Sequence, residues 1–200
     1  MASQLDIANW ALTMLGEKRI SALSDDTDNA ELILGGWNML RDALLVAQGW
    51  RFAIERTSLA ADTATPAWGF DYQYTVPGHV VRVLQVGQFY PGPDMSDYRN
   101  SDGAEYRIEQ GRILTNEGAP LYVKWLINTV DIGSWHPAFA KLMACDIADY
   151  VQPRAVQSDA AAQRIAFNRS QAWMLAGTTN AIEDPPDYPA DDTWLAAHAS

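Results

Sequence analysis

A change of period at residues 70–78 decides the fold class of this 200-residue chain. The stretch places large apolar side chains at every second position and closes with Pro77-Gly78: Phe70, Tyr72, Tyr74 and Val76. Such alternation predicts a strand with one buried face, and the Pro-Gly pair predicts the turn after it. The same aromatic row could stack on sugars, but a buried sheet face produces the pattern more simply.

More strands are predicted on the C-terminal side of this turn. Residues 80–86 and 121–127 are apolar runs of strand length. Residues 105–109 and 112–115 flank Gln110-Gly111, a pattern typical of a β-hairpin. The short connections predict antiparallel pairing throughout.

Helices are predicted before this region. Residues 3–15 carry apolar side chains at helical spacing, Ser3 can cap the helix together with Asp6, and Gly16 is placed to end it. Residues 24–29 are rich in capping side chains and acids, which predicts a second helix that ends near Gly49. Its Gly35-Gly36 pair predicts either a kink or a neighbouring backbone that packs unusually close.

Helices return near residue 134. We expect Ser134 to cap a helix that has Pro137 in its first turn and is alanine-rich over 138–150. Pro153 should interrupt it, and Ser158 or Asp159 should start a further helix that runs to about Leu175, before Gly177.

The order of helices, strands and helices without βαβ alternation predicts an α+β fold. We expect one domain over residues 1–177, in which helical parts 1–49 and 134–177 form one bundle and 50–133 is an inserted, antiparallel β-rich region. Residues 178–200 contain five acids, three prolines and no Lys or Arg. With Tyr188, Trp194 and Leu195 as anchors, they predict an extended arm that docks on a partner. A disordered tail, or one folded back on its own domain, is the alternative.

Composition limits the functional classes. The net charge of −11 argues against tight nucleic-acid binding, although an acidic surface would let a duplex slide past. The single cysteine, Cys145, excludes an internal disulfide, and its apolar neighbours predict a buried, unreactive thiol. Without a signal sequence or an apolar run of membrane-spanning length, we expect a soluble protein made in a reducing cytoplasm and no membrane partner.

The sequence offers no site of recognisable chemistry. It lacks the common nucleotide, zinc-protease and serine-hydrolase motifs. His79, His136 and His198 lie in unrelated segments, so we expect no metal, no cofactor and no catalytic residues. Asn100, Asp102, Gly103 and Glu109 have calcium-loop spacing, but Tyr98 stands where the first carboxylate is required and the flanks indicate strands.

An ordered set of segments along nearly the whole chain resembles tail tubular protein A, the head-to-tail adaptor family of short-tailed bacteriophages. The segments that carry the resemblance are 9–16, 20–23, 40–45, 49–53, 56–59, 68–77, 80–86, 121–123, 135–139 and the terminal Asp192-Thr193-Trp194-Leu195-Ala196-Ala197. The family usually has a basic residue after this terminal anchor, where the present chain has His198.

The resemblance implies a structural virion protein and not an enzyme. It implies a twelve-fold ring between the portal protein and the tail nozzle protein (tail tubular protein B), with a tail fibre as a further candidate partner and double-stranded DNA passing without tight binding. The arm, through Tyr188, Trp194 and Leu195, would dock on the portal. The subunit would be made in the cytoplasm of a bacterial host and reside in the virion tail.

Two alternatives from other classes stay open. One is a tail-associated polysaccharide or peptidoglycan hydrolase, which needs a cleft with converging carboxylates, one of them with a raised pKa. The other is a monomeric sugar-binding module built on the aromatic strand.

Overall fold

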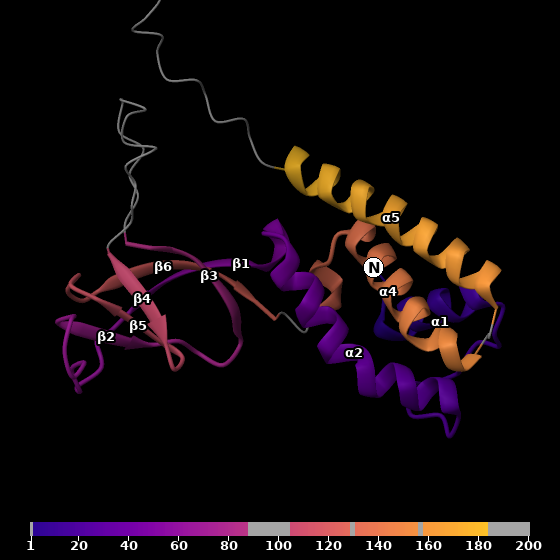
Figure 1. Ribbon diagram of the computed structural model, residues 1–200, viewed down its shortest axis with the longest axis horizontal. Helices are drawn as coiled ribbons and strands as arrows, with labels where there is room; N and C mark the ends of the chain where they lie inside the picture. Colours follow the sequence, from indigo (N-terminus) through magenta and orange to yellow (C-terminus); the bar gives the residue numbers. More distant parts are fainter. Residues whose placement is uncertain (1, 88–104, 129–130, 156–157, 184–200) are drawn as a thin grey trace, which may run out of the picture. The chain divides into compact units, whose positions relative to one another are not determined.

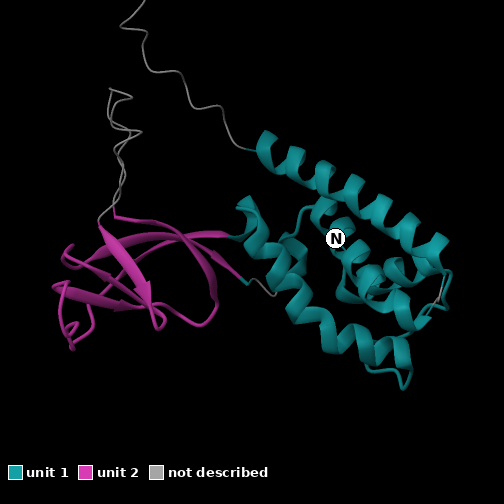
Figure 2. Cartoon of the chain, viewed as in Figure 1, with its two compact units in different colours: residues 1–53, 128–184 teal, residues 54–127, 185–200 magenta. Residues whose placement is uncertain are grey.

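The computed structural model of the chain describes residues 2–87, 105–128, 131–155 and 158–183. The protein has an α+β fold with four α-helices and two small antiparallel sheets in these residues (Figure 1). Contacts divide it into two compact units, where the sequence predicts one domain (Figure 2). Unit 1 comprises residues 1–53 and 128–184, and unit 2 contains the β-rich residues 54–127. The predicted insertion, 50–133, is therefore close to unit 2 in extent.

Unit 1 is built around helix α4 (Pro137–Ala155), against which three other helices pack: α1 (Gln4–Leu15), α2 (Asp28–Ala47) and α5 (Asp159–Ile182). Buried side chains occur all round α4, as expected for a central helix, and they include Phe139, Leu142, Met143, Cys145 and Ile147. Short 3₁₀ turns cover Arg51–Ala53 and Ile132–Ser134. The buried position predicted for Cys145 is confirmed.

The predicted ends of the N-terminal helices are confirmed. Ser3 and Asp6 form a reciprocal capping box at the start of α1, and Gly16 ends the helix with a φ of 79°. Thr27, within the predicted capping stretch, caps α2 by accepting a hydrogen bond from the Ala30 N–H.

Gly36 lies under the ring of Tyr150 from α4, so that a Cβ at this position would be 2.7 Å from Tyr150 Cε1. A close approach thus explains one glycine of the Gly35-Gly36 pair, although the neighbour is a side chain.

Two predictions for helix α4 are wrong. Ser134 lies in a 3₁₀ turn, and His136 caps α4 because its Nδ1 accepts from the Ala138 N–H at 3.1 Å. Pro153 does not interrupt α4, which continues for two more residues. The missing N–H of Pro153 leaves the Asp149 carbonyl without its helical partner, but Asp149 is exposed, so water can replace the bond.

Helix α5 also passes the predicted stop at Gly177 and ends at Ile182. Residues 178–182 are therefore helical and do not belong to an extended arm. The side chain of Asn180 holds this last turn, because its Nδ2 donates to the Gly49 carbonyl at 3.0 Å and its Oδ1 accepts from the Arg51 N–H at 2.8 Å.

Unit 2 contains two three-stranded antiparallel sheets. The first has the order β1 (Ile54–Leu59), β6 (Leu121–Ile127), β3 (Val80–Val86). The second has the order β2 (Tyr72–Thr75), β5 (Arg112–Thr115), β4 (Tyr106–Glu109). Both contribute to one core, which is made of Tyr74, Val86, Ile113, Leu121, Val123 and Trp125.

The hairpin predicted at Gln110-Gly111 is confirmed. Glu109 pairs with Arg112, and the two turn residues have φ angles of 49° and 72°. Positive φ at both positions matches the twist of the flanking strands.

The buried face predicted for the aromatic strand is only partly correct. Tyr74 is fully buried, and its hydroxyl donates to the Glu117 carbonyl at 2.8 Å. Tyr72 is 39% exposed, while Gln73, on the opposite face of the strand, is buried. Phe70 and Val76 lie outside the strand.

Candidate functional site

The three residues predicted to dock on a partner, Tyr188, Trp194 and Leu195, lie outside the described residues. The structure therefore gives no geometry for the arm. Each of the two units has candidate binding surfaces of its own.

The histidines have separate surroundings. His79, in unit 2, has Nε2 at 3.6 Å from Glu55 Oε2. His136, in unit 1, has Nε2 at 4.0 Å from Glu183 Oε1, at the end of α5. His198 and most of the calcium-like stretch (Asn100, Asp102 and Gly103) lie outside the described residues, and Glu109 is in strand β4. Among the residues that the structure describes, no three His, Cys, Asp or Glu side chains are grouped to hold a metal ion.

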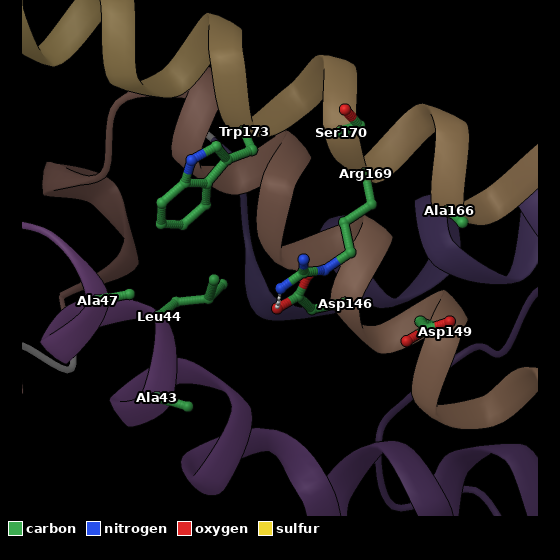
Figure 3. A pocket seen from close by; sticks show the side chains of 9 residues that line it. All are labelled: Ala43, Leu44, Ala47, Asp146, Asp149, Ala166, Arg169, Ser170 and Trp173. Carbon is green, nitrogen blue, oxygen red and sulfur yellow. Dashed lines mark hydrogen bonds and ion pairs between the residues drawn. The ribbon is translucent and has the colours of Figure 1, made fainter.

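Helices α2, α4 and α5 line an open groove of about 490 Å³ in unit 1 (Figure 3). Its α2 wall is formed by Ala43, Leu44 and Ala47. The α5 wall carries Arg169, Ser170 and Trp173, and Asp146 and Asp149 come from α4. The groove is open because the alanine side chains of its α2 wall are small. The charged side chains of Asp146, Asp149 and Arg169 make its floor polar.

One ion pair occupies this floor. Figure 3 shows Arg169 reaching from α5 to Asp146, and the Nε–Oδ1 and Nη2–Oδ2 distances are 2.6 and 3.3 Å. The Asp146 side chain is only 10% exposed, and burial raises the pKa of this carboxyl although Arg169 acts to lower it. The hydrogen bond to Asp146 raises the pKa of Arg169. Both carboxylate oxygens of Asp146 accept from the guanidinium. This bidentate ion pair therefore connects α4 to α5.

A layer of aromatic rings continues from the groove into unit 1. Trp173 contacts Trp50 edge-on with ring centroids 6.1 Å apart, and Trp50 contacts Phe139 at 4.9 Å. Trp135 and Trp37 extend the layer, stacked at 6.1 Å. The Trp50 indole donates to the Leu44 carbonyl at 2.7 Å. Trp173, which lines the groove, therefore packs against this layer of aromatic side chains.

Helix α5 presents a second surface, directed away from its packed face. The packed face buries Ala161, Ile165, Ala172 and Ala176. The other side exposes large apolar side chains, and we define the outer face of α5 by these residues: Phe167, Met174, Leu175 and Ile182. Phe167, Met174 and Ile182 are seven and eight residues apart, a spacing that places them on one side of a helix.

Unit 2 has a groove of its own, of about 300 Å³, beside strand β2 and the β4–β5 turn. Trp68, Phe70 and Gln73 line it together with Glu109 and Arg112. Trp68 is 87% exposed, whereas tryptophan side chains in folded proteins are on average largely buried. Of the row considered at first for sugar stacking, Phe70 reaches this groove, whereas Tyr74 belongs to the core.

The sequence pattern does not single out Asp146, Arg169 or Trp68. Asp146 and Arg169 are 23 positions apart on different helices, so no local spacing relates them. Trp68 lies next to the aromatic strand, and its exposure depends on the path of the segment before β2.

No helix in the described parts of the chain is both long and apolar enough to cross a membrane. Neither protein-family models nor curated proteins match this chain.

Proposed function

We propose that this protein is a head-to-tail adaptor of a short-tailed bacteriophage, a ring subunit that joins the portal protein to the tail nozzle protein. The proposal starts from the ordered sequence resemblance. The observation that supports it best is the outer face of α5, where Phe167, Met174, Leu175 and Ile182 are exposed on one side of a helix.

An exposed row of large apolar side chains is costly in a protein that remains alone, and contiguous patches of this kind mark interaction sites. In a closed ring each subunit uses two different surfaces, one toward each neighbour. The outer face of α5 supplies one such surface, in a helix that spans about 36 Å at 1.5 Å per residue. In this proposal the four helices of unit 1 act as one bundle that forms the ring wall.

The charge of the chain fits the same role. Fourteen Lys and Arg are opposed by 25 Asp and Glu. A channel lined by such subunits repels the phosphate backbone and lets the genome pass without tight binding. In this proposal the protein resides in the virion tail. The nozzle protein binds the ring on the side away from the portal, and a tail fibre is a further candidate partner on that side.

The C-terminal arm docks on the portal in this proposal, with Tyr188, Trp194 and Leu195 as anchors. Aromatic anchors in partner pockets carry much of the binding energy of an interface, and prolines reduce the entropy lost when an arm becomes ordered.

The test is the mass of a complex with the matching portal ring. The full-length protein and a truncation after Glu183, which keeps all of α5, are each mixed with the portal and measured by native mass spectrometry. We expect twelve copies on the portal for the full-length chain and few or none for the truncation. A full-length chain that does not bind the portal contradicts the adaptor proposal.

A second candidate, hydrolysis of a cell-wall or capsule glycan, is favoured by one observation. The unit 1 groove holds Asp146 and Asp149, and the pKa of Asp146 is raised by burial. The bidentate contact with Arg169 argues against it, because a general acid must be free to give its proton to substrate. We expect no release of reducing sugar from peptidoglycan or capsule by the wild type. Release that Asp146→Asn abolishes would establish the hydrolase instead.

A further inference from the structure

The unit 2 groove lies on the face of a sheet that is directed away from the core. Tyr74 and Ile113 turn one face of the β2–β5–β4 sheet into the core. Successive side chains of a strand point to opposite faces, so Gln73 and Leu114, which pair across β2 and β5, share the other face. Gln73 is buried, Leu114 is half-buried, and both line the groove. Together they form the floor of the groove.

The rim of this groove presents aromatic rings. Trp68 and Phe70 line it from either side of Gly69, whose φ of 86° glycine adopts without strain. The segment is held at its C-terminal end, because the Asp71 N–H donates to the side-chain oxygen of Asn116 at 3.0 Å. Trp68 is 87% exposed, so packing within unit 2 does not explain its place. A large, flat apolar surface is therefore available to a ligand beside the floor.

Charged and amide groups of both signs complete the lining. Glu109 and Arg112 are paired residues at the β4–β5 turn, both are exposed, and Gln110 lies between them. Arg112 Nε is 3.9 Å from Asp62 Oδ2, and that oxygen already accepts from the Thr75 hydroxyl at 2.9 Å. An anionic ligand would be repelled by Glu109, and a cationic one by Arg112. The lining therefore favours a neutral ligand that both donates and accepts hydrogen bonds.

A sugar ring combines these properties. Its C–H groups form an apolar face that can lie on an indole, and its neighbouring hydroxyls can donate to a carboxylate and accept from a guanidinium or an amide. Pyranoses with equatorial hydroxyls, such as glucose and N-acetylglucosamine, have the flattest apolar faces.

Two other ligands that stack on aromatic rings fit less well. The free carbonyls of a polyproline peptide only accept hydrogen bonds, so Glu109 would lose water without gaining a donor. The phosphates of a nucleic acid would be repelled by Glu109 and by the net charge of −11.

We infer that the unit 2 groove binds a neutral glycan, with one pyranose ring stacked on Trp68 and its hydroxyls bound by Glu109, Gln110 and Arg112. Its volume of about 300 Å³ is at the lower limit for ligand pockets, which suits roughly one or two sugar units of a longer chain. The site binds its glycan without cleaving it. It is independent of the proposed ring, so either proposal can fail alone. In a ring, many weak sites of this kind would act together.

The site is tested by isothermal titration and saturation-transfer NMR of the full-length protein, with cellotriose and triacetylchitotriose as probes. We expect saturable binding of at least one of these trimers, and Trp68→Ala should weaken it about tenfold or more. Because Trp68 is exposed, this variant should keep the wild-type melting temperature. Tyr122→Ala is the matched control, because it removes an exposed aromatic ring of unit 2 outside the groove and should leave the affinity unchanged.

Two further compounds identify the feature that is recognised. Sorbitol carries hydroxyls like those of glucose but has no ring face, and it should not bind. Hexaproline tests the peptide alternative and should not bind either. The inference is overturned if neither trimer binds at millimolar concentration, if trimer binding is unaffected by Trp68→Ala, or if hexaproline binds in place of the sugars.

Glu109→Gln tests the preference for a neutral ligand separately from the fold. The wild type should bind cellobiose more tightly than cellobiouronic acid, which differs by one carboxylate. Glu109→Gln should reduce this preference severalfold, because it removes the repulsion. Glu109 is exposed, so the melting temperature should not change. A preference that Glu109→Gln leaves unchanged would overturn the assignment of Glu109 to the site.

Discussion

At the scale of single residues, Asp146 and Arg169 combine two opposing effects on one carboxyl. Burial disfavours the charged form and raises the pKa of Asp146, whereas the guanidinium favours it. The raised pKa shows that burial is the larger effect. When the folded-state pKa of an Asp lies above its unfolded-state pKa, the free energy of unfolding falls as the pH rises from the lower pKa to the higher one. Below both pKa values the carboxyl is protonated in both states and this destabilisation is absent.

We predict that Arg169→Met lowers the free energy of unfolding by about 1–2 kcal/mol at pH 7, because a largely buried carboxylate loses its partner. The loss is smaller than for a fully buried pair, since the Arg169 side chain is 44% exposed and solvent screens the interaction. Without Arg169 the folded-state pKa of Asp146 rises further. The loss should therefore shrink as pH falls below that raised pKa, because the carboxyl is then neutral.

Urea unfolding of wild type and variant at pH 7 and at pH 4.5 measures this difference. Arg154→Met is the matched control, because Arg154 and Asp28 form a 2.7 Å pair in which both side chains are exposed. Its effect should stay within about 0.5 kcal/mol at either pH. Equal destabilisation by Arg169→Met at both pH values would show that packing, and not the buried charge, accounts for the loss.

At the scale of elements, the α2–α4 contact depends on a glycine whose neighbour is also a glycine. Gly36 has the Tyr150 ring at 2.7 Å from where a Cβ would be, while no atom lies within 4 Å of that position at Gly35. Both residues are in the same helix, so their intrinsic propensities are equal and only the surroundings differ.

We predict opposite effects for two identical substitutions. Gly35→Ala should raise the free energy of unfolding by about 0.5–1 kcal/mol, the usual gain of alanine over glycine in a helix. Gly36→Ala should lower it by about 1 kcal/mol, because the displaced ring costs more than the helix gains. Thermal unfolding of both variants gives the comparison, and a second change, Tyr150→Ala, should convert Gly36→Ala into a stabilising substitution. Equal gains from both alanines would mean that the ring moves aside freely.

At the scale of the whole molecule, the outer face of α5 is free to contact a neighbour in the proposed ring because the fold of unit 1 makes little use of it. The helix packs through alanines and Ile165, so its contribution to unit 1 comes from a narrow face. Phe167, Met174, Leu175 and Ile182 contribute little to that packing because they are exposed. Changes there should leave the monomer intact and act on its contacts with other chains.

We predict that Phe167→Glu with Met174→Lys leaves the melting temperature of the monomer within a few degrees of wild type and abolishes the twelve-copy complex with the portal. Charged groups in a desolvated interface cost far more than exposed ones. Phe167→Leu with Met174→Leu, which keeps both positions apolar, should assemble normally. Native mass spectrometry reads out both variants, and a charged variant that still forms the full complex would place the subunit interface elsewhere.

The sequence by itself determined the features that depend on near neighbours in the chain. The capping box at Ser3, the stop at Gly16 and the hairpin at Gln110-Gly111 each depend on backbone groups within a few residues. The α+β class follows from hydrophobic periodicity in the same way, and so does the burial of Cys145 among apolar neighbours. Local hydrogen bonds and local φ preferences decide such features, and the sequence states both directly.

Only the tertiary structure decided features that depend on distant partners. Asn180 carries α5 past Gly177 because it bonds to residues near position 50, and Asp146 meets Arg169 because two helices pack. Gln73 is buried while Tyr72 is partly exposed, since the surroundings of each face, and not the alternation alone, fix what is covered. Propensity and periodicity act within a segment, whereas the free energy gained by burying a side chain depends on which other segment packs against it.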